Sequence, residues 1–126
     1  MDDSRKDYFI VLCASGFENP EKVRSALMFA TLAASANYRT ILFCIQNAVE
    51  VMVKGAIEKI ESSKPNTPTI AQRLQEALEM GVEIQCCSQT MANKGLTEKD
   101  LIEGASVAGA MSLIALVTEA KGTLCF

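Results

Sequence analysis

The chain has 126 residues, of which 49% are hydrophobic and 21% charged, and its formal net charge is −3. This length and composition predict a single domain over residues 1–126, and the acidic balance argues against binding to nucleic acid. No apolar run approaches the ~18 residues of a membrane span and no signal peptide is evident, so we expect a soluble, cytoplasmic protein that does not bind membranes.

The first half of the chain alternates between short apolar runs and amphipathic segments. An apolar run over residues 8–14 predicts a strand that is buried on both faces. The helix predicted over residues 19–37 opens with Asn-Pro-Glu, which supplies an N-cap, a proline at the first helical position and an acidic first turn. Residues 39–45 predict a second strand, and residues 47–60 predict one amphipathic helix with Asn47 as its N-cap.

The second half of the chain begins at residues 62–68, a stretch rich in helix breakers that predicts an exposed connection. Helical spacing of apolar residues predicts a third helix over residues 70–80, which Gly81 ends. Residues 82–87 alternate as a third strand. A polar connection is expected over residues 88–95.

The last predicted helix, residues 97–120, is apolar nearly all round, and a final strand is expected over residues 122–126. A helix with apolar side chains on every side is buried on more than one side. In a chain this short, we expect part of that surface to meet another copy of the protein, with a central helix in a larger core as the alternative. The order of elements predicts an α/β fold, a doubly wound and mostly parallel sheet with helices on both faces.

Histidine is absent, which excludes Ser-His and Cys-His catalysis and histidine metal ligands. The cysteines are five, an odd number, and no CxxC pair occurs among them, so we expect neither a disulfide framework nor a metal site. Free cysteine is among the most buried residue types, which makes core packing the ordinary role of such residues. The five are Cys13, Cys44, Cys86, Cys87 and Cys125.

Sites in an open α/β sheet form beyond the carboxyl ends of the strands. Cys87 ends the third predicted strand and is the candidate nucleophile, while Cys86 points to the opposite side of the pleat. Nearby helix N-termini and the Lys94 cation would favour a thiolate at Cys87. The alternative is that Cys87 is a buried, inert cysteine. The candidate pocket residues around it are Ser15, Gly16, Asn47, Ser88, Gln89 and Met91.

Three stretches, residues 9–16, 43–55 and 81–104, resemble the DsrE/DsrF-like family of sulfur-relay proteins. In the third stretch the functional cysteine of the family falls on Cys87, and a basic residue followed by glycine falls on Lys94-Gly95. The chain departs from the family pattern at Asn47-Ala48, where many relatives have Asp-Gly, and at Lys94, where arginine is common.

The resemblance implies a flavodoxin-like topology, a homo-oligomer (trimer or hexamer) and no cofactor. It also implies that sulfane sulfur is carried as a persulfide or thiosulfonate on Cys87 and passed to a partner thiol, for instance on a small sulfur-carrier protein. Ser88 and Gln89 would donate hydrogen bonds to the persulfide. Such exchange needs a nucleophilic thiolate, and neither histidine nor a metal ion. The chain would then be a sulfurtransferase with a covalent cysteine intermediate.

Two other functions remain open from the sequence. The first is a non-catalytic, homo-oligomeric module that binds a small ligand or nucleotide in the strand-end cleft, which would tolerate replacement of Cys87. The second is a thiol redox protein, in which peroxide would oxidise Cys87 to a sulfenic acid.

Overall fold

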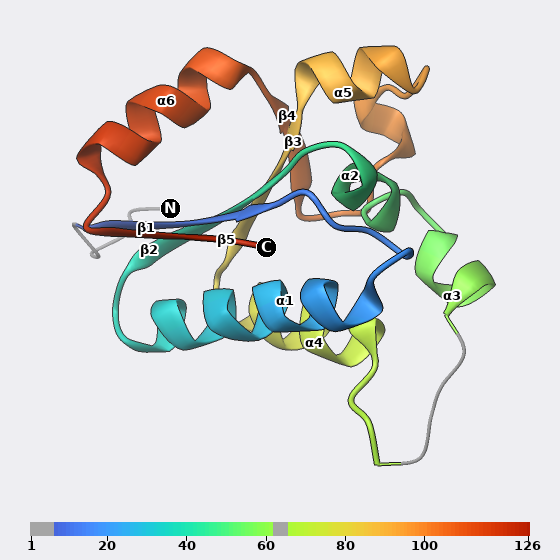
Figure 1. Ribbon diagram of the computed structural model, residues 1–126, viewed down its shortest axis with the longest axis horizontal. Helices are drawn as coiled ribbons and strands as arrows, with labels where there is room; N and C mark the ends of the chain where they lie inside the picture. Colours follow the sequence, from blue (N-terminus) through green and yellow to red (C-terminus); the bar gives the residue numbers. More distant parts are fainter. Residues whose placement is uncertain (1–6, 62–65) are drawn as a thin grey trace.

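A sheet of five parallel strands forms the centre of the computed structural model, which describes residues 7–61 and 66–126 (Figure 1). The strands lie in the order β4-β3-β2-β1-β5, so β4 and β5 are the edges. Their bounds are β1 (Tyr8–Cys13), β2 (Arg39–Cys44), β3 (Glu83–Cys87), β4 (Ala105–Ala108) and β5 (Gly122–Cys125).

Helices cover both faces of this sheet. The helices α1 (Pro20–Ser35) and α4 (Ile70–Glu79) lie together below the sheet in Figure 1, and α6 (Ala110–Glu119) crosses above it. The predicted α/β architecture, a parallel sheet with helices on both faces, is therefore confirmed. The shorter helical elements are α2 (Asn47–Val51), α3 (Ala56–Ile60), α5 (Ser88–Asn93) and the 3₁₀ helix Glu98–Asp100.

The helix α1 begins and packs as its sequence predicts. Asn19 caps it through its side-chain oxygen, which accepts a hydrogen bond from the Lys22 amide, and Pro20 takes the first helical position. One face of α1 carries small and branched apolar residues that pack on β1 and β2. The main core lies between this helix face, α4 and the sheet.

Alternation along the strands divides their apolar side chains between the two faces. In β2, Leu42 belongs to the core on the α1 side, whereas Ile41 and Phe43 point to the side that α6 crosses. Phe43 is fully buried, at 0% exposure. Both faces of the central strands are therefore covered, as was predicted for the continuous apolar run of residues 8–14.

The single helix predicted over residues 47–60 is wrong, because the structure divides it into α2 and α3. Gly55 adopts a left-handed conformation with φ of 78° between the two, which ends the helical path. Val53 makes an isolated bridge with Leu101, and the Ile102 amide donates to the Met52 carbonyl oxygen. Contacts with a segment far along the chain thus replace the intrahelical bonds.

The long helix predicted over residues 97–120 is also wrong, since only its second half is α-helical. Gly104, with φ of 95°, turns the chain into β4, which pairs with β3, and α6 begins after Gly109. The polar connection predicted over residues 88–95 contains the helix α5. Of the loop predicted over residues 62–68, residues 62–65 lie outside the described part of the chain.

The helix α6 packs on β1 yet leaves large apolar side chains in solvent. Met111 is 77% exposed and Ile114 is 55% exposed, and no residue of this helix is buried. Within the described residues, no helix is both long and apolar enough to cross a membrane.

Candidate functional site

Cys87 is the last residue of β3, and α5 begins at the next residue. Its side chain is 7% exposed and points to the face of the sheet that α6 crosses. Cys86 is fully buried on the opposite face, in the core against α1. The prediction that these neighbouring thiols point to opposite faces is confirmed, and Cys87 is the one beside the strand-end loops.

The first turn of α6 lies next to Cys87. Cys87 pairs with Ala108 across β3 and β4, which brings the following residue, Gly109, beside Ser88. A Cβ atom at Gly109 would lie 3.9 Å from the Ser88 Oγ atom. No side chain caps the first turn of α6, and its amide groups carry the partial positive charge of a helix N-terminus.

Gln85 lies two residues before Cys87 on the same face of β3. Its side-chain oxygen Oε1 is buried and has no hydrogen-bond partner among the described residues. A buried acceptor without a partner costs free energy, and such a group calls for an explanation, for instance a catalytic role or a bound water or ion. The alternation of β3 could have placed Gln85 beside Cys87, but burial of its amide depends on the neighbouring strands.

Lys94 lies at the far end of α5 from Cys87. Six helical residues separate the two, which corresponds to about 9 Å along the helix axis. The Lys94 Nζ atom forms an ion pair with the Glu50 Oε1 atom of α2 at 2.7 Å. The described contacts of Lys94 therefore join α5 to α2, and its participation in chemistry at Cys87 stays a prediction.

The loops after β1 and β2 meet at Gly16 and Asn47. A Cβ atom at Gly16 would lie 2.3 Å from the backbone oxygen of Asn47, so only glycine allows the two backbones to come this close. The backbone amide of Gln46 also donates a hydrogen bond to the Thr90 Oγ1 atom of α5, at 3.2 Å. The structure thus brings Ser15-Gly16, Asn47 and the helix after Cys87 together at the carboxyl ends of the strands.

The other three predicted pocket residues all belong to α5 and differ in exposure. Ser88 and Gln89 are exposed at its start. Met91 is 3% exposed and packs into the main core. Met91 therefore anchors α5, while Ser88 and Gln89 remain accessible beside Cys87.

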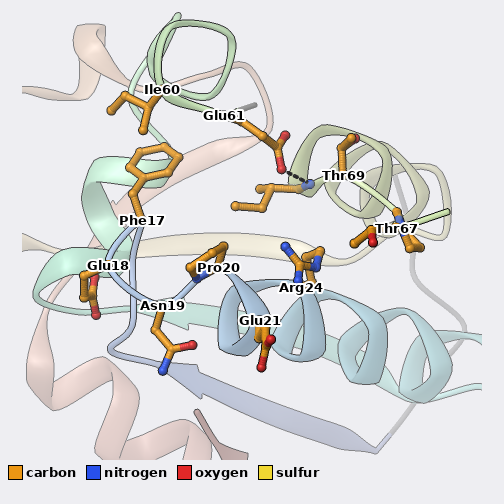
Figure 2. A pocket seen from close by; sticks show the side chains of 12 residues that line it. Phe17, Glu18, Asn19, Pro20, Glu21, Arg24, Ile60, Glu61, Thr67 and Thr69 are labelled. Carbon is orange, nitrogen blue, oxygen red and sulfur yellow. Dashed lines mark hydrogen bonds between the residues drawn. The ribbon is translucent and has the colours of Figure 1, made fainter. Parts of the chain in front are cut away.

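A cavity of about 450 Å³ lies beside the loop after β1, between the first turns of α1 and α4 (Figure 2). Figure 2 shows Phe17 pointing towards Ile60 at one end and Arg24 pointing towards the start of α4. None of the eight predicted site residues lines this cavity. The sequence predicted the helix starts near residues 19 and 70, but not their proximity.

Three acidic residues and one arginine are among the residues that line the cavity, namely Glu18, Glu21, Glu61 and Arg24. Glu61 accepts hydrogen bonds from the Ile70 amide at 2.6 Å and from the Ala71 amide at 3.3 Å. An anionic side chain thus already occupies the N-terminus of α4. The excess of carboxylates disfavours a phosphate group in this cavity.

Glu61→Ala should lower the free energy of unfolding by about 1 kcal/mol, because two first-turn amides of α4 lose their acceptor. Chemical denaturation measures this change. Glu58→Ala is a matched control, since Glu58 is an exposed residue of α3 for which the structure describes no hydrogen bond. Equal stability of the two variants would contradict the capping role of Glu61.

The described residues contain no group of three or more His, Cys, Asp or Glu side chains arranged to hold a metal ion. The five cysteines are free, and Cys125 is the exposed one.

Comparison with known proteins gives a family and a fold. The model of the DsrE/DsrF-like family matches residues 6–126. The uncharacterized protein MJ0989 of Methanocaldococcus jannaschii is 31% identical over 118 residues, which cover 94% of this chain and 98% of that protein. The uncharacterized protein MK0008 of Methanopyrus kandleri is 26% identical over 95% of this chain and 94% of its own length.

Two solved structures share the fold. The ychN protein from E. coli superimposes with a TM-score of 0.78 and 18% identity, covering 96% of this chain and all of that one. The protein MTH1491 from Methanobacterium thermoautotrophicum gives a TM-score of 0.67 at 18% identity, covering 95% of this chain and 98% of that one. At these identities the likeness shows the fold.

Proposed function

The chain belongs to the DsrE/DsrF-like family, and from this premise we propose that it carries sulfane sulfur on Cys87 and passes it to a partner thiol. The observation that carries the proposal is the position of Cys87 at the carboxyl end of β3, beside the uncapped first turn of α6. Family membership suggests a role in sulfur relay, and the persulfide on Cys87 is our proposal for its chemistry.

The proposed reaction has two thiol–disulfide-type exchanges. The Cys87 thiolate attacks the sulfane sulfur of a donor, the donor leaves with the bonding electron pair, and a Cys87 persulfide forms. A partner thiolate then attacks the outer sulfur atom, and Cys87 leaves as a thiolate. Both steps place negative charge on sulfur, which the first turn of α6 stabilises.

Neighbouring side chains have supporting roles in this proposal. Ser88 and Gln89 are exposed beside the thiol and able to donate hydrogen bonds to a persulfide anion. The buried Gln85 Oε1 atom is available to accept a hydrogen bond when the persulfide is protonated. Lys94 would act at longer range through its charge, which Glu50 partly neutralises.

Mass spectrometry of the intact protein tests this proposal. The reduced protein is incubated with thiosulfate, tetrathionate or polysulfide, and a small thiol is then added as acceptor. We expect a gain of whole sulfur atoms, or of a thiosulfonate, that the acceptor removes. An unchanged mass with all three donors would overturn the proposal.

We also infer that the exposed apolar face of α6 meets another copy of the chain in a trimer or hexamer. Met111, Ile114 and Val117 form this face, and their exposed fractions of 77%, 55% and 40% are large for such side chains. Their positions at i, i+3 and i+6 place them along one side of the helix. An assembly would bury this face near the first turn of α6, and hence near Cys87.

Ile114→Lys should shift the protein to a smaller assembly, because a lysine in a buried interface carries an unpaired charge. The same change costs little folding stability, since Ile114 is already 55% exposed. Size-exclusion chromatography with light scattering measures the mass. Glu119→Lys, an exposed position on another side of α6, is the control. The same mass for wild type and Ile114→Lys would contradict the inferred interface.

A second candidate function, a ligand-binding module, is favoured by the cavity of about 450 Å³ beside the loop after β1. Its three acidic lining residues suit a neutral or cationic small molecule better than a nucleotide. Since Cys87 does not line the cavity, such binding would be unchanged in Cys87→Ser, whereas sulfur loading would be lost.

A further inference from the structure

Three cysteines lie in one row across neighbouring strands of the sheet. The register pairs Cys13 of β1 with Cys44 of β2, and Cys44 with Cys86 of β3. All three side chains belong to the core on the α1 side. Their exposed fractions are 3%, 0% and 0%, so water is largely absent from this row.

The spacing of paired strands suits a disulfide. Neighbouring strands lie about 4.8 Å apart, and Cα atoms joined by a disulfide are usually about 4.4–6.8 Å apart. By this criterion Cys44 could bond either neighbour. The Cys13 thiol has another partner, because its Sγ atom donates to the Ser15 carbonyl oxygen at 3.4 Å. Cys86, which pairs with Cys44 in the register of β2 and β3, is therefore the neighbour left for Cys44.

The three thiols also differ in pKa, because their surroundings differ. Interaction with the neighbouring Cys44 thiol lowers the pKa of Cys86, the same interaction together with burial raises the pKa of Cys44, and burial raises the pKa of Cys13 to about 11. The thiolate is the nucleophile in sulfur oxidation. Cys86 is therefore the attacking group, and Cys44 is the neighbour that resolves the product.

We propose that Cys44 and Cys86 form a second redox-active site, a buried dithiol that a hydroperoxide converts reversibly into a disulfide between β2 and β3. The Cys86 thiolate attacks one peroxide oxygen, which gives a sulfenic acid and, after protonation, water or an alcohol. The Cys44 sulfur then attacks the sulfenic sulfur and releases a second water. Two thiols are oxidised by two electrons in total, and one hydroperoxide is reduced.

The site is independent of the sulfur-carrier proposal. Cys86 and Cys87 lie on opposite faces of β3, so the dithiol and the proposed carrier thiol do not share a pocket. Cys44 is the last residue of β2, and Cys86 is the next to last residue of β3. This position near the strand-end loops gives a small oxidant a short path into the core during local opening, while burial excludes large reagents.

Peptide mapping under non-reducing conditions tests the proposal in a Cys87→Ser background, which removes the adjacent thiol. The folded protein is treated with hydrogen peroxide, then denatured, alkylated and digested with trypsin. Cleavage places Cys44 in residues 40–54 and Cys86 in residues 74–94. We expect peroxide to link these two peptides and dithiothreitol to separate them.

Variants and a denatured sample make the result decisive. The link should disappear in Cys44→Ala and persist in Cys13→Ala, since Cys13 bonds Ser15. Circular dichroism checks that each variant is folded. The peptide map of the Cys87→Ser protein tests the proposal even if Cys44→Ala or Cys13→Ala does not fold. The proposal is overturned if both thiols stay alkylatable, if Cys86 gives only sulfinic acid, if Cys13 forms the link, or if the link needs denaturant.

Discussion

Cys87→Ser should abolish the loading of sulfane sulfur on the strand-end site, while Cys86→Ser should leave it intact. The two residues are neighbours in sequence, yet Cys86 faces the core against α1 and Cys87 faces the side of α6. A serine hydroxyl is nearly isosteric with the thiol and does not form a persulfide. The pair of variants therefore separates chemistry at one position from the general effect of losing a thiol.

Cys125 needs its own control in that experiment. It is the exposed cysteine among the described residues, so polysulfide will also modify it without any specific site. Loading is therefore measured in a Cys125→Ser background, by intact mass and by mapping of the modified peptide. Modification that is confined to Cys125 in the wild type, and unchanged in Cys87→Ser, would contradict the carrier proposal.

Gly16→Ala should destabilise the protein by about 3 kcal/mol, which is a large effect for a single methyl group. The added Cβ atom would lie 2.3 Å from the Asn47 carbonyl oxygen and 2.7 Å from its carbonyl carbon. Backbone atoms cannot change rotamer, so the loops after β1 and β2 must separate. These loops carry predicted site residues, and we expect sulfur loading to fall as well.

Urea denaturation of Gly16→Ala and Gly109→Ala measures this effect against a matched control. The atom nearest to a Cβ at Gly109 is the Ser88 Oγ atom at 3.9 Å, an ordinary contact. We expect Gly109→Ala to cost at most about 1 kcal/mol, as alanine is a poorer N-cap than glycine. Similar losses for the two variants would show that the approach of Gly16 to Asn47 is not restrictive.

Local sequence patterns predicted most of the elements that position the site. The apolar runs of β1, β2 and β3 and the capped start of α1 follow from strand alternation, helix periodicity and capping chemistry, which act over a few residues. The segment from residue 97 to 120 was predicted as one helix, apolar nearly all round. Pairing of residues 105–108 with β3 outweighs this local pattern.

Contacts between distant segments were beyond the reach of the sequence. The ion pair between Lys94 and Glu50 joins residues 44 positions apart, so the predicted partner of Cys87 is paired elsewhere. The cavity is lined in part by Glu61, which reaches the first turn of α4. Neither relation leaves a periodic signal, because side chains that meet in the folded chain obey no fixed sequence spacing.

The cysteines illustrate both what a local pattern predicted and what only the tertiary structure decided. Alternation along one strand was enough to assign Cys86 and Cys87 to opposite faces, since successive side chains of a strand point in opposite directions. The row formed by Cys13, Cys44 and Cys86 was decided by the tertiary structure alone. Strand order and register place these thiols side by side, and the pattern within one strand does not determine which residue of the neighbouring strand lies beside it.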